Sequence, residues 1–142
     1  RVINVYTDGA SAGNGKASAK AGWGVWFEDP ELQHLNRAGR LAGETQTNNR
    51  AELTAIIRAC QLCPMTGAQL QIYTDSQYSV KAIQEWQQGW RRRGWRTSNA
   101  AAVLNKDLIR LLERELRKHV PRPNLIYVKG HAGHVGNEAA DR

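Results

Sequence analysis

The stretch VINVYTDG, residues 2–9, alternates apolar and polar side chains and then ends in an acid and a glycine. Alternation with a period of two predicts a β-strand. The same ending returns further along the chain, where residues 69–76 read QLQIYTDS. An acid at the carboxyl end of a buried strand lies near the crevice where mixed α/β sheets bind ligands. Asp8 and Asp75 are therefore candidate site residues.

Around these two stretches, the pattern of apolar residues predicts strands first and helices later. The expected elements are a strand over residues 2–8, a turn or loop over 10–15, strands over 19–28 and 32–41, a helix opening at Thr47, a strand over 69–74, a helix capped by Ser76 or Asp75, a helix from Asn99 or Asn105 to His119, a strand over 124–128 and a helix from about Gly136. Short connections between the first three strands favour an antiparallel meander. The chain is expected to be one α/β domain over residues 1–142, with a mixed sheet flanked by helices.

Composition points to an ordinary globular domain with an unevenly placed charge. The chain is 41% hydrophobic and 23% charged, and its net charge is +7. Residues 81–122 hold eleven Lys/Arg against four Asp/Glu, whereas the rest of the chain holds nine of each. A surplus confined to one segment indicates a footprint for a polyanion such as nucleic acid. No apolar run approaches the roughly 20 residues that span a bilayer, so no membrane partner is expected.

The only cysteines, Cys60 and Cys63, give no disulfide framework. A reducing, intracellular compartment is therefore expected, the cytoplasm first, with the nucleus or mitochondrion as alternatives. A redox-active pair is the competing interpretation, but that chemistry favours a helix N-terminus. Here Pro64 follows the pair at the end of the expected helix, which favours structural cysteines.

Four carboxylates are candidate metal ligands, namely Asp8, Glu52, Asp75 and Asp141. Carboxylates that converge on one point repel one another unless a cation neutralises them. Hard oxygen ligands without nearby thiolates favour Mg²⁺ or Mn²⁺ over zinc. Two such ions roughly 4 Å apart can activate water and stabilise the leaving oxygen in phosphodiester hydrolysis. Taken singly, each acid also fits a turn, a helix cap or a solvated helix face.

The motifs around these acids resemble those of type 1 ribonuclease H, the cellular catalytic domain with a basic protrusion. The matching segments are YTDG at residues 6–9 with Gly13-Asn14, TNNRAE at 47–52, YTDS at 73–76, and VKGHAGH at 128–134 with NEAAD at 137–141. The resemblance implies the ribonuclease H fold, with a five-stranded mixed sheet in the order 3-2-1-4-5. It places the basic protrusion at about residues 81–100. It also marks the C-terminal helix as cut short, because the sequence stops one residue after Asp141.

The same resemblance implies hydrolysis of the RNA strand of an RNA–DNA hybrid, leaving 5′-phosphate and 3′-OH ends. Asp8 would bridge two Mg²⁺ ions, for which Mn²⁺ could substitute. Glu52 and Asp75 would complete the ion on the leaving-group side, and Asp141 would complete the ion that holds the attacking water.

Two further catalytic roles follow from the resemblance. Glu138 is similar to the family's outer-shell acid, and His131 matches a mobile-loop histidine that assists product departure or proton traffic. A histidine flanked by glycine and alanine can move, and its reference pKa lies near neutrality. The alternative is a His131/His134 metal pair, although two histidines without further ligands are weak evidence for zinc.

Amide and hydroxyl side chains are the expected contacts to the hybrid. Asn14, Asn48 and Gln77 match family positions at the sugar–phosphate edges, and an amide can both donate to and accept from a 2′-OH. Thr47 and Asn105 resemble a phosphate pocket for the DNA strand. The alternatives are turn or cap roles, above all for Asn14 and for Asn105, which could cap the long helix.

The basic protrusion interleaves aromatic and basic side chains. Its candidate substrate contacts are Trp86, Trp90, Trp95, Arg91, Arg92 and Arg93. Trp86 and Trp90 are one helical turn apart, so mutual packing is expected, and Trp90 or Trp95 could also border a DNA sugar. The arginines form either a solvated charged face or a phosphate contact, and the local charge surplus favours phosphate.

Three other functions compete with a monomeric, hybrid-cleaving nuclease. An inactive hybrid-binding module would lack one of the four carboxylates, and all four are present. An integrase-like strand-transfer domain does not explain the protrusion or the GHAGH loop. A small-molecule α/β domain lacks a glycine-rich phosphate fingerprint and leaves the arginine cluster without a role.

Overall fold

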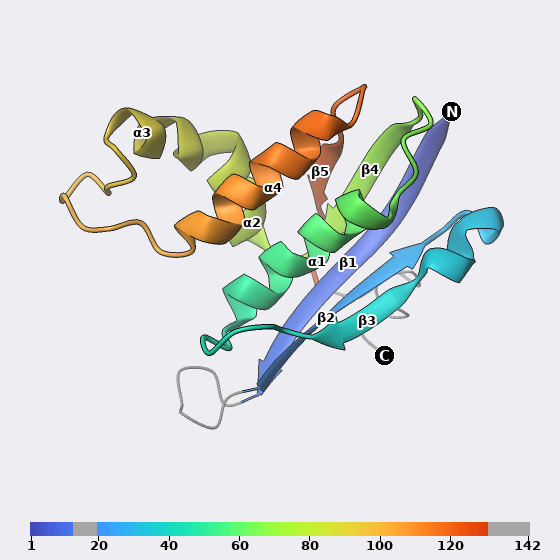
Figure 1. Ribbon diagram of the computed structural model, residues 1–142, viewed down its shortest axis with the longest axis horizontal. Coiled ribbons are helices and arrows are strands. Elements are labelled where there is room, and N and C mark those ends of the chain that lie inside the picture. Colours follow the sequence, from blue (N-terminus) through green and yellow to red (C-terminus); the bar gives the residue numbers. More distant parts are fainter. Residues whose placement is uncertain (13–19, 131–142) are drawn as a thin grey trace.

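In this computed structural model, which describes residues 1–12 and 20–130, five strands form one mixed sheet (Figure 1). The strands are β1 (Val2–Ala12), β2 (Lys20–Phe27), β3 (Arg37–Arg40), β4 (Gln69–Thr74) and β5 (Asn124–Tyr127). Their order across the sheet is β3-β2-β1-β4-β5, which confirms the expected order. The first three strands form the antiparallel meander. β4 pairs with β1 in parallel, and β5 pairs with β4 in parallel.

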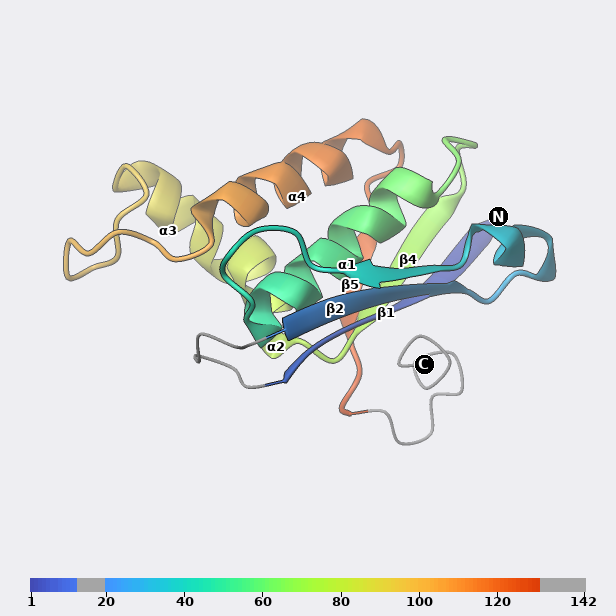
Figure 2. The ribbon, with the colours of Figure 1, turned by 60° about the horizontal axis from the view of Figure 1, so that its bottom comes forward.

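Helices connect the strands. They are the 3-10 helix η1 (Pro30–Leu35), α1 (Asn48–Leu62), α2 (Gln77–Lys81), the π-helical segment η2 (Ala82–Trp86), α3 (Gln87–Arg92) and α4 (Lys106–Lys118). Of these, α1, α2 and α4 lie where the apolar pattern predicts helices. α1 packs against the sheet and α4 packs against α1, whereas α3 and the loop after it extend away from the sheet (Figure 2). No helix of the described residues has the length and apolar character needed to span a membrane.

The core lies between the sheet, α1 and α4. Its largest fully buried side chains include Ile3, Val5, Phe27, Leu53, Ile56, Leu70, Ile72, Ile109, Leu112 and Leu116. Each stabilises the fold by about 1.5–3 kcal/mol relative to an exposed side chain. Burial on one face of β1 and β4 also determines their register, in which Tyr6 pairs with Tyr73. Asp8 and Asp75, two residues beyond each tyrosine, therefore reach the same end of the sheet.

Two local predictions are wrong. Residues 10–12 were expected in a loop but continue β1, because they pair with β2. The strand therefore extends beyond the residues that alternate between apolar and polar. Residues 30–35, most of which were expected in the third strand, form η1 instead. The third strand is therefore shorter than expected and consists of β3 alone. The missed signal is Asp29-Pro30, since Asp29 caps η1 by accepting a hydrogen bond from the Glu31 N–H and proline suits a first helical turn.

The helix starts are confirmed where alternatives were open. Ser76, rather than Asp75, caps α2 and accepts a hydrogen bond from the Ser79 N–H, and Thr47 caps α1 by accepting from the Arg50 N–H. The long helix begins after Asn105, although the Asn105 side chain makes no capping hydrogen bond. The helix expected from about Gly136 lies outside the described residues.

Cys60 and Cys63 are free thiols buried at the end of α1. Burial raises the pKa of the Cys60 thiol to about 12 and that of the Cys63 thiol to about 11. A thiol with so high a pKa is protonated and unreactive at neutral pH. This favours the structural role over a redox role.

Glu113 joins α4 to its neighbours and should make stability depend on acid pH. Burial alone would raise its pKa, but hydrogen bonds from Arg122, Gln87 and Arg117 outweigh burial and lower the pKa to about 2. A carboxyl whose pKa is lowered by folding stabilises the protein above its unfolded pKa and ceases to do so as the pH falls through the folded pKa. Between about pH 4.5 and 2 we expect the free energy of unfolding to fall by on the order of 2 kcal/mol. Solvent limits the fall to this size, because Arg117 and Arg122 are partly exposed.

Thermal melts of Glu113→Gln at neutral pH and in this acid window check the expectation. The variant should start less stable and lose less stability on acidification than the wild type. Glu85→Gln, an exposed carboxylate on η2, is the control and should follow the wild type. Parallel pH profiles for all three proteins would contradict the role of Glu113.

Candidate metal centre and nucleic-acid interface

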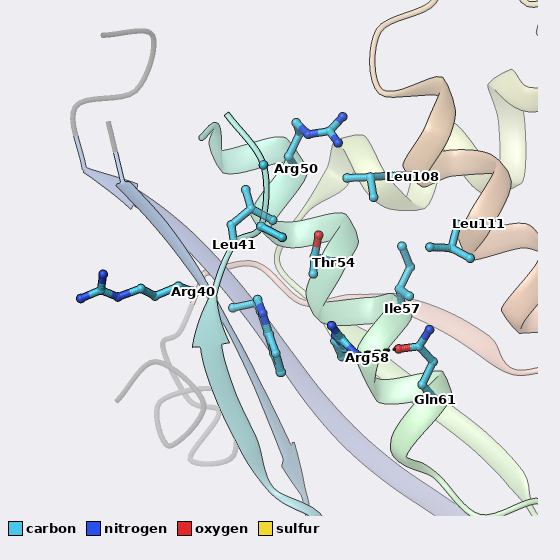
Figure 3. Close-up of a pocket in the computed structure, with 12 residues that line it drawn as sticks. Arg40, Leu41, Arg50, Thr54, Ile57, Arg58, Gln61, Leu108 and Leu111 are labelled. Atoms are coloured by element: carbon cyan, nitrogen blue, oxygen red, sulfur yellow. Dashed lines mark hydrogen bonds between the residues drawn. The ribbon is translucent and has the colours of Figure 1, made fainter. Parts of the chain in front are cut away.

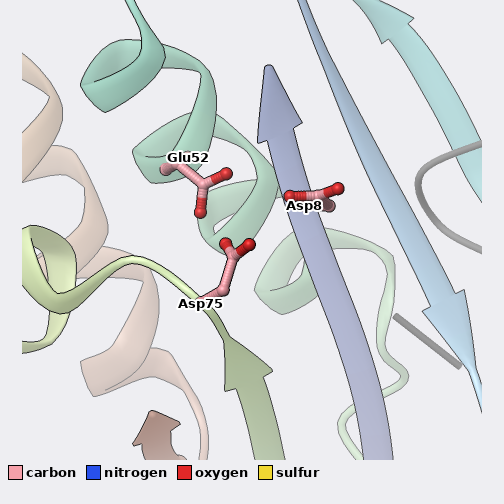
Figure 4. A group of neighbouring side chains, drawn as sticks. All are labelled: Asp8, Glu52 and Asp75. Carbon is pink, nitrogen blue, oxygen red and sulfur yellow. The ribbon is translucent and has the colours of Figure 1, made fainter. Parts of the chain in front are cut away.

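Three of the four candidate carboxylates converge at one end of the sheet (Figure 4). Asp8 comes from β1, Glu52 from the second turn of α1, and Asp75 from the residue after β4. One oxygen from each lies within 4.8 Å of the others. Asp8 is 4% exposed and Glu52 is 6% exposed, whereas Asp75 is half-buried at the edge of the cluster. The sequence identified these residues, and the parallel register of β1 and β4 with the position of α1 brings them together.

Gly9 allows α1 to approach β1 closely enough to deliver Glu52. The Gly9 N–H donates to Glu52 Oε1 at 2.5 Å and also lies 3.0 Å from Asp8 Oδ1. Thr74 Oγ1 donates to Glu52 Oε2 at 3.3 Å. A Cβ on Gly9 would lie 2.4 Å from the carbonyl carbon of Ala51, a distance that backbone atoms cannot accommodate. The glycine is therefore required by packing at this point.

The electrostatics of the cluster favour a bound cation. Burial raises the pKa of Glu52, and the nearby negative charge and hydrogen bond of Asp75 raise it further, against the lowering effect of Gly9 and Thr74. A carboxylate in this setting is stabilised either by a proton or by a positive charge. The donor set consists of hard carboxylate oxygens, which is what Mg²⁺ and Mn²⁺ prefer. The residues present therefore fit a divalent metal site.

An open cleft of about 520 Å³ lies beside the carboxylates. Glu52 and Asp75 line it, together with the amide side chains of Asn48 and Gln77. Asn48 starts α1 and Gln77 starts α2, so two helix N-termini meet in the cleft. Asn48 and Gln77, two of the three amide residues expected to contact the hybrid, thus lie beside the candidate metal centre.

Thr47 and Asn105 are both hydrogen-bonded to Arg50, a residue that was not among the predicted site residues. Arg50 donates to Asn105 Oδ1 at 3.3 Å and makes a bidentate ion pair with Asp107 at 3.0 and 2.7 Å. The Asn105 amide donates to the Tyr78 hydroxyl at 3.0 Å. The Asn105 backbone has a positive φ of 62°, which asparagine tolerates better than most residues. The signal for Arg50 was its place inside the motif TNNRAE.

Trp86 and Trp90 pack on each other, as expected, and the ring contacts extend to Tyr78 and Trp95. Ring centroids are 5.9 Å apart for Tyr78 and Trp86, 5.7 Å for Trp86 and Trp90, and 6.3 Å for Trp90 and Trp95. The guanidinium groups of Arg91 and Arg110 lie 5.8 and 6.0 Å from the ring centre of Trp95. Arg110 comes from α4 and was not anticipated, because only the tertiary structure brings it to the protrusion.

Arg91, Arg92 and Arg93 are exposed at the end of α3. No ion pair joins any of them to a carboxylate within the described part of the chain, so their charge is available to an external anion. The remaining predicted site residues, Asn14, His131, His134, Glu138 and Asp141, lie outside the described residues.

Known proteins are similar to this chain in both sequence and fold. A family model for RNase H matches residues 1–142. A ribonuclease H of Cyanothece is 41% identical over 143 residues, covering 99% of this chain and 85% of the relative. A ribonuclease H of Schizosaccharomyces pombe is 45% identical over 138 residues, covering 96% of this chain and 49% of the relative.

Two solved structures are similar to this one. LC9-RNase H1, described as a type 1 RNase H with the type 2 active-site motif, superposes with a TM-score of 0.72 at 28% identity, covering 99% of this chain and 68% of that chain. A foamy viral protease-reverse transcriptase in complex with an RNA/DNA hybrid superposes with a TM-score of 0.76 at 18% identity, covering 97% of this chain and 19% of that chain. The second likeness shows the shared fold alone.

The five-stranded sheet, with acids at the ends of its adjacent parallel strands, defines a ribonuclease H-like α/β domain. The match over the whole length and the relatives at 41% and 45% identity make the family plain. The chain belongs to the ribonuclease H family, nucleases of the hydrolase class that degrade RNA in RNA–DNA hybrids.

Proposed function

We propose that this chain is an endonuclease that hydrolyses the RNA strand of RNA–DNA hybrids with the help of two divalent metal ions. The observation that carries the proposal is the convergence of Asp8, Glu52 and Asp75 within 4.8 Å beside an open cleft. Asp141, outside the described residues, would complete the ligand set. Mg²⁺ is the proposed ion and Mn²⁺ its substitute, on the chemistry of the oxygen donors.

Different residues of the protein are proposed to have separate roles around the scissile phosphate. Asp8, Glu52 and Asp75 would hold the ions, which when bound supply an activated water and a stabilised leaving oxygen. Water adds to phosphorus and the 3′-oxygen leaves, so the products carry 5′-phosphate and 3′-OH ends. The Gly9 N–H and Thr74 hydroxyl orient the Glu52 carboxylate for this task. Glu138 and His131 are proposed to assist at the attacking water and in proton traffic or product departure.

Recognition of the hybrid is proposed to use two regions of the protein. Asn48 and Gln77 line the cleft with groups that can both donate to and accept from a 2′-OH, and Asn14 is proposed to join them. Thr47 and Asn105, linked through Arg50, would take a phosphate of the DNA strand. Trp86, Trp90 and Trp95 with Arg91, Arg92 and Arg93 would follow the DNA backbone along the protrusion. We further propose that the protein acts as a monomer within the cell, where its free thiols stay reduced.

Cleavage of three matched duplexes tests this function. With Mg²⁺, the RNA–DNA hybrid should be cut at internal positions, whereas RNA duplex and DNA duplex of the same sequence should stay intact. EDTA should stop the reaction, and excess Mg²⁺ should restore it. Product ends are read by labelling, since only a 3′-OH is extended by a polymerase. Equal cleavage of the RNA duplex, or activity that survives EDTA, would overturn the proposal.

Removal of the protrusion arginines should weaken hybrid binding and flatten its salt dependence. The slope of log K against log salt falls by about 0.9 for each phosphate that the protein no longer neutralises, so Arg91, Arg92 and Arg93 replaced together by Gln should lower it by roughly 2–3. Fluorescence anisotropy in EDTA over a series of salt concentrations measures the slope. The charge-matched control replaces Arg37, Arg40 and Arg58, which lie on β3 and α1, and should leave the slope unchanged. An equal reduction in both triple variants would mean that net charge alone governs binding.

A further inference from the structure

A second hollow lies between α1, the β2–β3 edge of the sheet and α4 (Figure 3). Its volume is about 360 Å³, within the lower part of the roughly 300–1,000 Å³ range of ligand pockets. Apolar side chains from all three parts of the fold line it, namely Trp23, Leu41, Ile57, Leu108 and Leu111. We call this hollow the α1–α4 groove. Its size suits one or two bulky apolar side chains.

The charged lining of the α1–α4 groove is basic. Arg40, Arg50 and Arg58 line it, and none of its lining residues is acidic. Arg50 is held at one end by its ion pair with Asp107. Arg40 and Arg58 are exposed and form no ion pair with any residue of the described ranges 1–12 and 20–130. Two uncompensated guanidinium groups therefore border an apolar floor, an arrangement suited to bidentate binding of carboxylates.

The groove faces away from the candidate metal centre. An α-helix has about 3.6 residues per turn, so Thr54, Arg58 and Gln61 project from the side of α1 opposite Glu52. Asn48, Glu52 and Asp75 line the other cleft, and the two clefts share no lining residue. A molecule in the groove therefore leaves the carboxylate cleft open.

The chemistry of the groove disfavours a single-stranded nucleic acid as its occupant. A single-stranded nucleic acid would use the arginines for phosphate and would need an open aromatic face on which to stack a base. The face of Trp23 is already covered by the Arg58 guanidinium, 5.4 Å from the ring centre, and Arg58 is braced by its hydrogen bond to Gln61 Oε1 at 3.2 Å. The remaining floor is aliphatic, which suits a leucine-like or phenylalanine-like side chain.

We propose that the α1–α4 groove binds a short acidic peptide segment of a partner protein. A bulky apolar side chain of the segment fills the floor between Ile57, Leu108 and Leu111, and its carboxylates bind Arg40 and Arg58. Because the partner contacts Arg40 and Arg58 and leaves both the carboxylate cleft and the Arg50–Asp107 pair free, the partner and the hybrid bind at the same time. The partner thereby tethers the nuclease near its substrate without altering the chemistry.

Fluorescence anisotropy with a designed probe tests the docking site. The probe is a fluorescein-labelled peptide in which Leu and Phe are flanked by Asp residues. We expect saturable binding to the full chain that weakens at least about tenfold in Arg58→Glu and in Arg40→Glu. Arg37→Glu makes the same charge change on β3 outside the groove and should weaken binding less than about twofold. Peptides with Asp replaced by Asn, or with Leu and Phe replaced by Ser, should each bind at least about tenfold more weakly.

Competition and activity measurements distinguish the occupants. An RNA–DNA hybrid should not displace the peptide, and Arg58→Glu should cleave the hybrid at the wild-type rate. Displacement by the hybrid, or by a single-stranded oligonucleotide, would assign the groove to nucleic acid and overturn the proposal. Equal weakening in Arg37→Glu would reduce the binding to diffuse charge attraction, which also overturns it. Concentration-dependent dimerisation that Arg58→Glu abolishes, measured by sedimentation, would assign the groove to a second copy of the chain instead.

Discussion

Asp8→Asn should abolish cleavage of the hybrid while leaving hybrid binding nearly intact. The substitution keeps the size of the side chain but removes one of the negative charges that converge within 4.8 Å. Because a divalent cation depends on these charges, we expect the cleavage rate to fall by at least about three orders of magnitude, on the order of 4 kcal/mol of transition-state stabilisation. Lysine and arginine contacts elsewhere supply most of the affinity for nucleic acid, so binding should persist.

Single-turnover cleavage with Mg²⁺ measures the loss, and anisotropy in EDTA measures hybrid binding separately. Calorimetric titration of Mg²⁺ into the free protein should show that Asp8→Asn also loses metal binding, which a purely structural role would not predict. Glu44→Gln, an exposed carboxylate outside the cluster, is the matched control and should behave as wild type. A variant that kept more than about a tenth of the activity would remove Asp8 from the proposed ligand set.

The second large effect is expected at Gly9, where β1 and α1 meet. In Gly9→Ala, the new methyl group would lie 2.4 Å from the Ala51 carbonyl carbon and 2.5 Å from the Glu52 nitrogen. Backbone atoms of a packed helix cannot move aside as a flexible side chain can, so α1 must shift away from the sheet. We expect the free energy of unfolding to fall by about 3 kcal/mol or more. The shift also removes the Gly9–Glu52 hydrogen bond, so the folded fraction should cleave more slowly.

Urea denaturation measures the stability of Gly9→Ala, and activity is measured at temperatures where the variant stays folded. Gly22→Ala on β2 is the matched control, because its methyl group would meet only the Gly39 carbonyl oxygen, at 3.2 Å. That contact needs a shift of a few tenths of an ångström, and we expect a loss of roughly 1 kcal/mol or less. Equal losses in the two variants would show that the close approach of β1 and α1 places no special constraint on Gly9.

Local signals in the sequence anticipated much of the fold. The cap at Thr47 and the strand over residues 69–74 were correct, and Ser76 is one of the two caps expected for the next helix. Each of these features depends on neighbouring residues and on backbone hydrogen bonds. The errors arose where distant residues decide. β1 continues to Ala12 because β2 lies beside it. The small side chains at the end of β1 do not indicate that β2 pairs with them.

The candidate site divides in the same way. The identities of Asp8, Glu52 and Asp75 came from motifs, but their convergence depends on the register of Tyr6 with Tyr73 and on the approach of α1 over Gly9. The interaction of Arg110 with Trp95 and the link from Arg50 to Asn105 join residues on different helices. Helical periodicity predicts which face a residue occupies but not which other helix that face will meet.

The sequence by itself therefore indicated the family, the α/β class and the candidate residues for the chemistry, because motifs and periodicity are properties of neighbouring residues. Only the tertiary structure decided that three acids share one point and that a basic, apolar-floored groove opens behind α1. Both depend on contacts between segments far apart in the chain, which form when burial of the core brings β1, β4, α1 and α4 together. The acids at the ends of VINVYTDG and QLQIYTDS become a candidate metal centre through that packing.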